Sequence, residues 1–213
     1  MFAFNNDNTF CINLTSNPTR WANIQKRFTS INLPVTHWPA STPNDLTDTF
    51  VTNLSPNQKA CAQSHINIWR HIIQNNLDYA LILEDDACFD KQFWDKLNTI
   101  TPDPEWHMVV LNASEPMKEQ NKWCRVYEQY LTGGYILSNN GAKIVLDIFA
   151  NNFCASDWMT SRLELYNHSY SYFPWLIIQE GNESTIGSGV ELDHKKVLKC
   201  LGDIGYSLDN YII

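Results

Sequence analysis

Charged side chains are scarce in this chain of 213 residues, and positive charge is the scarcer kind. Only 18% of the residues are charged, and 15 Lys and Arg residues stand against 23 Asp and Glu residues, which gives a formal net charge of −8. No local cluster of basic residues offsets this balance. Because such a surface repels a polyphosphate backbone, we expect no nucleic-acid partner.

The sequence also lacks long hydrophobic runs. No stretch approaches the roughly 18 consecutive apolar residues that a transmembrane helix needs, so we expect no transmembrane segment. The N-terminus has neither the basic start nor the apolar run of a signal peptide, which makes the cytoplasm the expected location. The 23 Asn residues suit the AT-rich genome of a bacterium or a large virus.

Paired cysteine motifs are absent as well. The six Cys residues form no C-x-x-C pair and no Cys…His spacing typical of a zinc site. A chain of this length buries roughly 70% of the surface of its unfolded state, so it does not need disulfides to be stable. We therefore predict that most of the cysteines are reduced, buried thiols.

Apolar residues are present in the proportion of a globular domain. They make up 44% of the chain, and aromatic residues make up 13%, which is too much for a disordered segment. The length suits a single domain over residues 1–213. We place the motifs in a core of about residues 9–180 and expect the polar, Gly-rich tail over 181–213 to be mostly irregular.

Along the chain, segments with the apolar spacing of a strand alternate with segments that have the apolar spacing of a helix. For example, Cys61, His65, Ile68 and Ile72 fall on one face of a helix that begins at Ser55-Pro56. Alternating strands and helices predict an α/β fold with a mostly parallel central sheet. Strands are expected at 9–14, 35–38, 79–83, 107–111, 131–137 and 170–173, a surface excursion at 113–125, helices over 89–100 and 156–166, and further helices that begin near 16, 55 and 139.

An acidic triplet, Glu84-Asp85-Asp86, directly follows the apolar strand 79–83. In open α/β sheets, ligands bind outside the carboxyl ends of the strands. Strand geometry sends Glu84 and Asp86 to one side and Asp85 to the other. Carboxylates this close repel one another unless a cation neutralises them, and their oxygens select Mg²⁺ or Mn²⁺. The pattern indicates a metal-bound diphosphate, and the alternative is a solvated acidic turn that caps the next helix.

Other residues have both a functional and a structural interpretation. His65 lies on the apolar face of its helix, where a hydrogen-bonded core histidine is the commoner outcome. Arg20, at the start of the first helix, either meets a phosphate or ribose or is an ordinary surface residue. Asp157 opens a helix, either as its cap or as a carboxylate that faces a substrate. For the aromatic stretch 166–175, core packing is the first interpretation, and stacking on sugar rings is the second.

Several short motifs follow one another along the chain. They are Ile12-Asn13-Leu14 with Arg20-Trp21, Cys61-Ala62-Gln63-Ser64-His65 with Trp69-Arg70, the strand and triplet 81–86, Gly134-Tyr135-Ile136-Leu137-Ser138 with Gly141-Ala142, Asp157-Trp158, and the segment 174–179. In this order, over about residues 9–180, they resemble glycosyltransferase family 25. That family includes lipopolysaccharide galactosyl- and glucosyltransferases and the collagen hydroxylysine galactosyltransferases.

The resemblance implies a GT-A fold, which is a Rossmann-like α/β/α sandwich, together with a UDP-sugar donor, Mn²⁺ or Mg²⁺, and inversion at the anomeric carbon. It implies that a hexose, galactose or glucose, passes to a hydroxyl of a glycan or of hydroxylysine. Under it, Asp157 is the general base and Asp86 acts at the leaving diphosphate. The implied donor-binding residues are Ile12, Asn13, Arg20, Ser64, His65, Glu84 and Asp85, and the implied metal ligands are Glu84, Asp86 and the late residue His194.

Two departures from the family pattern keep other interpretations open. The family usually has glycines just before the helical motif that ends at His65, where this chain has Pro-Asn-Gln-Lys-Ala at 56–60, and the C-terminal part is short. The main alternative is therefore a catalytically inactive family member that acts as a binding or scaffold module. A metal-dependent nucleotidyltransferase or phosphohydrolase is a third, although the sequence has no P-loop. For His194, the structural alternative is an exposed residue without a ligand role.

Overall fold

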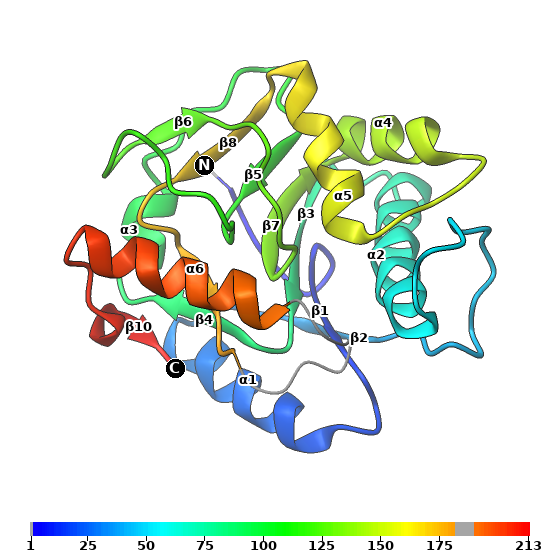
Figure 1. Cartoon of the computed structure of the whole chain (residues 1–213), viewed down its shortest axis with the longest axis horizontal. Helices are drawn as coiled ribbons and strands as arrows, with labels where there is room; N and C mark the ends of the chain where they lie inside the picture. The colour runs from blue at the N-terminus through cyan, green and yellow to red at the C-terminus, as the bar shows by residue number, and fades with distance from the viewer. Residues whose placement is uncertain (1, 182–189) are drawn as a thin grey trace.

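A seven-stranded sheet forms the centre of the molecule (Figure 1). The computed structural model describes residues 2–181 and 190–213. From one edge to the other, the strands are β2 (Thr36–Pro39), β1 (Thr9–Asn13), β3 (Tyr79–Glu84), β7 (Gly134–Ser138), β5 (Met108–Val110), β8 (Ser169–Tyr172) and β6 (Trp123–Arg125). The last of these lies in the segment predicted as a surface excursion, which local polarity did not distinguish from a loop.

Five of the seven strands run in the same direction, because β1 is parallel to β2 and β3, β5 is parallel to β8, and β7 is antiparallel to both β3 and β5. The edge strand β6 is antiparallel to β8. The predicted α/β fold with a mostly parallel central sheet is therefore confirmed.

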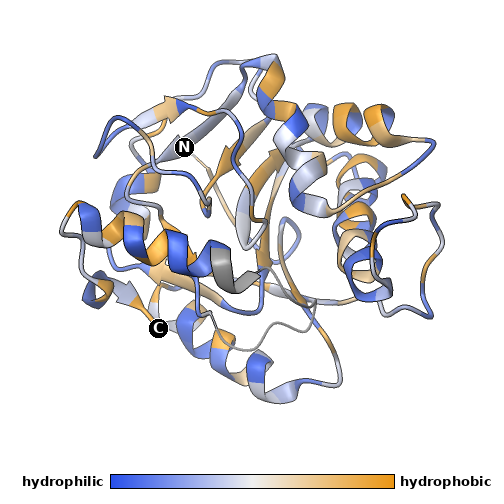
Figure 2. Cartoon of the chain, viewed as in Figure 1, coloured by the Kyte–Doolittle hydropathy of each residue, from blue (hydrophilic) through white to orange (hydrophobic). Residues whose placement is uncertain are grey.

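Helices cover both faces of the sheet and complete an α/β/α sandwich (Figure 1). One face carries α2 (Pro56–Gln74), α4 (Asn139–Phe149) and α5 (Ser156–Ser161), and the other carries α1 (Pro18–Ser30) and α3 (Phe93–Leu97). In β3, Ala80 and Ile82 belong to the core on the α2 side, whereas Leu81 and Leu83 belong to the core on the α1 side. A strand covered on both faces needs apolar residues at successive positions. In Figure 2 the central strands are coloured mainly as hydrophobic.

The helix starts follow the capping chemistry in the sequence. Asn17 accepts a hydrogen bond from the backbone N–H of Arg20 and so caps α1, with Pro18 in its first turn. Ser55 and Gln58 form a reciprocal capping box at the start of α2. These caps satisfy backbone donors that would otherwise lack partners, and they fix where each helix enters the sandwich.

The segment 89–100, predicted as one helix, contains a strand and a shorter helix instead. A second, antiparallel sheet has three strands, in the order β10 (Tyr211–Ile212), β4 (Ala87–Asp90) and β9 (Ile177–Gln179). Phe89 pairs with both neighbours in this sheet, and α3 begins only at Phe93. The prediction was wrong because the partners of the strand lie far away in the sequence, where local periodicity cannot reveal them.

The region after Gln179 is more regular than its polar composition suggests. It contains α6 (Val190–Asp203) and the strand β10. Leu201 of α6 is buried, and the hydroxyl of Tyr211 donates to the backbone carbonyl of Trp175 over 2.7 Å. Because these contacts join the C-terminal part to the core, the prediction of a mostly irregular tail was wrong.

Three smaller expectations concern cysteines, aromatic residues and membrane helices. All six cysteines are free, and Cys11, Cys88 and Cys200 are buried. Phe173 and Trp175 are fully buried, so this part of the aromatic stretch packs in the core. In the part of the chain that the structure describes, no helix is long and apolar enough to cross a membrane.

Candidate active site

A cavity of about 540 Å³ lies at the carboxyl ends of β1 and β3. The two strands are parallel neighbours, and Ile12 lies opposite Glu84. Ligands of open α/β sheets bind at such an edge, and the volume is within the usual range for small-molecule sites. All the residues that the sequence indicated line this one cavity: Ile12, Asn13, Arg20, Ser64, His65, Glu84, Asp85, Asp86, Asp157 and His194.

Asp85 is held on the β1 side of the cavity. One of its oxygens lies 2.6 Å from the guanidinium of Arg20, and the other accepts a hydrogen bond of 2.6 Å from the side-chain amide of Asn13. The oxygen of that amide in turn lies 3.2 Å from His37. Burial raises the pKa of Asp85 despite the opposing effects of Arg20 and Asn13. The triplet is therefore tied to the first strand and first helix through this residue.

Glu84 is the most firmly held carboxylate of the triplet. Its Oε1 accepts from the Thr132 hydroxyl at 2.9 Å and lies 3.3 Å from Nε2 of His65, and its Oε2 lies 3.4 Å from the amide of Gln179. Burial acts to raise the pKa of Glu84, but the hydrogen bonds and charges of its neighbours, His65 first, outweigh this effect and lower it. Glu84 therefore favours the ionised form.

Asp86 shares a hydrogen-bond donor with Glu84, although β3 ends at Glu84 and Asp86 itself lies in the turn that follows the strand. The side-chain amide of Gln179 donates to Asp86 over 3.3 Å and is shared with Glu84, and Arg20 lies 3.4 Å from Asp86. Burial first, and then the negative charge of Glu84, raise the pKa of Asp86 to about 7. Glu84 and Asp86 thus form a pair of repelling carboxylates, an arrangement that a cation stabilises.

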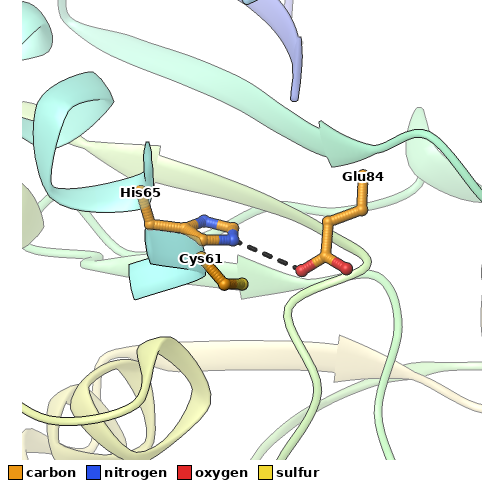
Figure 3. Close-up of side chains that lie close together, drawn as sticks. All are labelled: Cys61, His65 and Glu84. Carbon is orange, nitrogen blue, oxygen red and sulfur yellow. Dashed lines mark hydrogen bonds and ion pairs between the residues drawn. The ribbon is translucent and has the colours of Figure 1, made fainter. Parts of the chain in front are cut away.

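A buried chain of hydrogen bonds orients His65. The indole N–H of Trp69 donates to the hydroxyl of Tyr135 over 2.8 Å, and this hydroxyl lies 2.9 Å from Nδ1 of His65. Because the tyrosine oxygen already accepts one bond, we assign its own proton to the bond with Nδ1, which leaves the His65 Nε2–H directed at Glu84 (Figure 3). His65 is therefore both a hydrogen-bonded core histidine and part of the cavity wall.

Ser64, the neighbour of His65, is fully buried and has its hydroxyl occupied within the protein. It donates to the carbonyl of Ala60 over 3.0 Å and accepts from the backbone N–H of Ser41 over 2.9 Å. Residues 41–43 line the cavity. The structure therefore relates Ser64 to the position of this loop, whereas a direct contact with a donor stays a prediction.

Asp157 lies in the first turn of α5, but it is not the cap of that helix. The N-cap is Ala155, and the carboxylate of Asp157 accepts from the next backbone N–H, at 2.8 Å. Burial is the main reason why the pKa of Asp157 is raised, and the charges of Glu84 and Asp193 add to it. A carboxylate with a raised pKa in a cavity is a stronger base than an ordinary aspartate, so it can act as a general base.

An aromatic pair, formed by exposed Trp158 and half-buried Tyr130, lies next to Asp157. Trp158 is 52% exposed, its ring centroid is 6.3 Å from that of Tyr130, and the guanidinium of Arg162 lies 5.4 Å above its ring. The residue that follows Tyr130, Leu131, lines the cavity, as Asp157 does. Trp158 and Tyr130 therefore each adjoin, in the sequence, a residue that lines the cavity.

His194 reaches the cavity from α6. Its imidazole lies against Gly181, where a β-carbon would come within 2.2 Å of the ring, and the backbone of Gly181 has a φ of +73°, so both space and conformation favour glycine there. Burial lowers the pKa of His194, which favours the neutral imidazole that binds metals. Its role as a metal ligand stays a prediction.

Sequence reasoning missed several residues of the cavity. Thr132 and Gln179 hold the carboxylates of the triplet, and Asn112, Asp193 and Cys61 also line the wall. Gln179 ends a strand that the family motif includes and Cys61 opens the motif 61–65, so the sequence held a usable signal for these two residues. The others come from loops or helices that only the fold brings to this edge.

The fold and the cavity define a class of protein, an α/β sandwich whose acidic strand end faces a small-molecule site. A family model described as "Glycosyltransferase family 25 (LPS biosynthesis protein)" matches residues 6–131. Because the match covers more than half of the sequence, the chain belongs to glycosyltransferase family 25, and the resemblance seen in its motifs is confirmed.

Several named proteins are similar to this chain at low sequence identity. "Lipooligosaccharide biosynthesis protein lic2B" of Haemophilus influenzae is 23% identical over 234 residues, with 89% of this chain and 84% of the relative covered. A "Glycosyltransferase 25 family member" of Anopheles gambiae is 27% identical over 64% of this chain, and "Procollagen galactosyltransferase 1-B" of Xenopus laevis is 30% identical over 44% of it. The chain spans only 28% and 18% of the lengths of the latter two relatives.

Among solved structures, the chain aligns with a glycosyltransferase described as involved in the glycosylation of the major capsid of PBCV-1. The alignment covers 90% of this chain and 97% of the other, with a TM-score of 0.43 and 7% sequence identity.

Proposed function

We propose that this chain transfers a hexose, galactose or glucose, from a UDP-sugar to a hydroxyl group, with inversion at the anomeric carbon and with the help of Mn²⁺ or Mg²⁺. The observation that carries the proposal is the carboxylate pair Glu84 and Asp86, which share Gln179 and line a cavity next to Arg20. Membership of family 25 supports sugar transfer as the reaction.

The residues of the cavity fit a hard divalent cation. The charge of Glu84 contributes to the raised pKa of Asp86, and a cation between the two carboxylates would relieve that repulsion. Glu84 and Asp86 would hold it, and His194 would contribute from α6. When bound, the cation neutralises charge on the leaving diphosphate.

Arg20 would bind the phosphates of the donor. Its guanidinium already contacts Asp85 and Asp86, and its side chain keeps 27% of its surface exposed at the cavity. A guanidinium has several fixed donors, so it can hold a carboxylate and a phosphate together. Asn13 and the backbone at Ile12 would contact the nucleoside from the neighbouring strand.

Asp157 would remove the proton of the acceptor hydroxyl during the attack on the anomeric carbon. The pKa of Asp157 is raised toward neutral pH, and a general base is most effective when its pKa lies near the pH at which the enzyme works. The exposed ring of Trp158 beside it would contact the acceptor. The names of the relatives, in lipooligosaccharide biosynthesis and procollagen galactosylation, support two acceptor classes, a glycan and a hydroxylysine of a protein.

The test is the release of UDP from a panel of UDP-sugars in the presence of Mn²⁺ and the absence of an acceptor. The wild type should release UDP slowly from one hexose donor, and Asp86→Asn should abolish release without changing the unfolding transition. Asp147→Asn is the matched control, since Asp147 is exposed on α4. A wild-type protein that neither binds nor hydrolyses any donor would favour the inactive binding module instead.

A further inference from the structure

Three different metal-binding side chains meet on one wall of the cavity (Figure 3). The ligand atoms of Cys61, His65 and Glu84 all lie within 4.8 Å of one another. We propose that these residues form a binding site for a thiophilic divalent cation, with Zn²⁺ as the ion that suits them, and that zinc bound there withdraws Glu84 from the donor site.

Two of the ligands come from one helix and the third from the sheet. Cys61 and His65 are four residues apart in α2, so they project from the same face of that helix. Glu84 ends β3, the strand against which α2 packs. In Figure 3 the three side chains converge on one space between the helix and the strand. The spacing Cys-x-x-x-His is therefore a ligand spacing here, because the helix supplies the geometry that the sequence alone did not indicate.

The donor set selects zinc over the harder cations. A thiolate and an imidazole are softer ligands than carboxylates. Zn²⁺ accepts Cys, His and Glu ligands, whereas Mg²⁺ and Mn²⁺ prefer oxygen. Zinc bonds of about 2.0–2.3 Å place tetrahedral ligands roughly 3.5 Å apart. Nε2 of His65 and Oε1 of Glu84 already lie 3.3 Å apart, so the side chain of Cys61 would make the main adjustment, an inward movement of about 1 Å. Three protein ligands leave the fourth position open to the cavity.

The hydrogen bonds behind His65 hold its ring with Nε2 directed at the proposed zinc site. Metal-binding histidines usually have their other ring nitrogen bound by a fixed partner, and here Tyr135, itself bound by Trp69, lies 2.9 Å from Nδ1. Nε2 is therefore the nitrogen that faces Cys61 and Glu84. Zinc would displace the thiol proton, which would pass to solvent through the cavity. The imidazole would stay neutral by carrying its proton on Nδ1, from which it would donate to the Tyr135 oxygen.

The consequence for activity rests on the proposed function. Glu84 belongs both to this cluster and to the carboxylate pair with Asp86. A zinc ion bound by Glu84 occupies this carboxylate and offsets its charge, which leaves Asp86 without its partner for the hard cation. We therefore expect Zn²⁺ to inhibit donor hydrolysis that Mn²⁺ supports.

The site itself is tested by zinc binding without any donor, in competition with a chromophoric chelator. The wild type should bind one zinc ion, and Cys61→Ser should weaken binding at least about 100-fold, because loss of second-layer partners alone costs 10- to 100-fold. Cys124→Ser is the matched control, since Cys124 lies on β6 at the far edge of the sheet and should leave the affinity unchanged. Cobalt in place of zinc should give a sulfur-to-metal absorption band that Cys61→Ser loses.

Equal zinc affinity in the wild type and in folded Cys61→Ser, or no zinc binding by the wild type, would overturn the site. A Tyr135→Phe variant gives a second measure, with an expected loss of about 10- to 100-fold. Because binding is measured with the metal alone, a protein that binds zinc through Cys61 but hydrolyses no donor would refute the proposed function and leave the zinc site standing.

Discussion

The guanidinium of Arg20 lies 2.6 Å from Asp85 and 3.4 Å from Asp86, so one cation bridges two members of the acidic triplet. The contact exists because β1 and β3 are parallel neighbours, which places the start of α1 beside the end of β3. The positive charge of Arg20 therefore offsets part of the repulsion among the three adjacent carboxylates at this sheet edge.

Arg20→Ala should weaken UDP binding. The variant removes a charged donor from the cavity, and hydrogen bonds to charged groups contribute about 1.5–3 kcal/mol, which corresponds to roughly a 10- to 150-fold loss of affinity. Calorimetric titration with UDP in the presence of Mn²⁺ measures the affinity of the variant and of the wild type. Arg125→Ala is the control, since Arg125 pairs with Asp103 outside the cavity. An unchanged affinity for UDP in Arg20→Ala would exclude a role for Arg20 in donor binding.

Lys96→Met should strongly destabilise the fold. The ammonium of Lys96 lies 2.6 Å from Asp90 and 2.8 Å from the hydroxyl of Tyr206, and the side chain of Asp90 is fully buried. Removing one partner of a buried pair leaves an uncompensated charge and typically costs about 3–5 kcal/mol. Chemical denaturation measures the loss.

Asp90→Asn combined with Lys96→Met provides the control for this pair. The double variant has no buried charge, so it should recover part of the stability that Lys96→Met loses. Tyr206 connects the pair to the C-terminal part of the chain. If the double variant were less stable than the sum of the two single variants predicts, the ion pair would not be the source of the effect.

Glu164→Gln should change how stability depends on pH. Glu164 is 1% exposed; one of its oxygens accepts from the backbone N–H of Gln129 at 2.9 Å, and the other has no hydrogen-bond partner within the described residues. Burial raises the pKa of Glu164 to about 8. The folded state therefore keeps a proton that the unfolded state loses above about pH 4.5, so stability falls as the pH rises from there to about 8.

The size of this effect follows from the pKa shift. At about 1.4 kcal/mol per pKa unit, ionisation of Glu164 costs a few kcal/mol at pH 8. Glutamine has the same shape without the charge, so the variant should gain stability relative to the wild type as the pH rises. Urea denaturation at pH 5 and pH 8.5 compares the two proteins. Parallel pH profiles would show that Glu164 is already ionised in the folded state.

Local patterns predicted the fold well where contacts are near in sequence or where a strand is covered on both faces. The run 79–83 was predicted as a strand, and Ser55-Pro56 marked the start of a helix. By contrast, β4 was predicted as part of a helix, because its partners in β9 and β10 follow about 90 or more residues later and nothing local indicates them.

Many residues of the candidate site were predicted from the sequence, but the contacts among its residues were not. The rule that ligands bind at the carboxyl ends of strands was enough to single out Glu84 and its neighbours. It could not indicate that Gln179 bridges Glu84 and Asp86, or that Tyr135 orients His65, since these contacts join elements that only the sheet order brings together.

Asp157→Asn should slow transfer to an acceptor much more than it affects donor binding. General bases contribute about 10²- to 10⁴-fold to rate, and asparagine keeps the shape of the side chain without its basicity. Because the pKa of Asp157 is raised, the transfer rate should fall on acidification at a pH above the ordinary aspartate value of 3.8.

Trp158→Ala separates this role from acceptor binding. Trp158 follows the proposed base in the sequence and is exposed, so its loss should raise the KM for an acceptor and leave the pH profile of kcat unchanged. Steady-state kinetics across pH, with UDP affinity measured alongside, distinguishes the two variants. A full transfer rate in Asp157→Asn would assign the base to another carboxylate of the cavity, and Asp193, which also lines it, would be the next to replace.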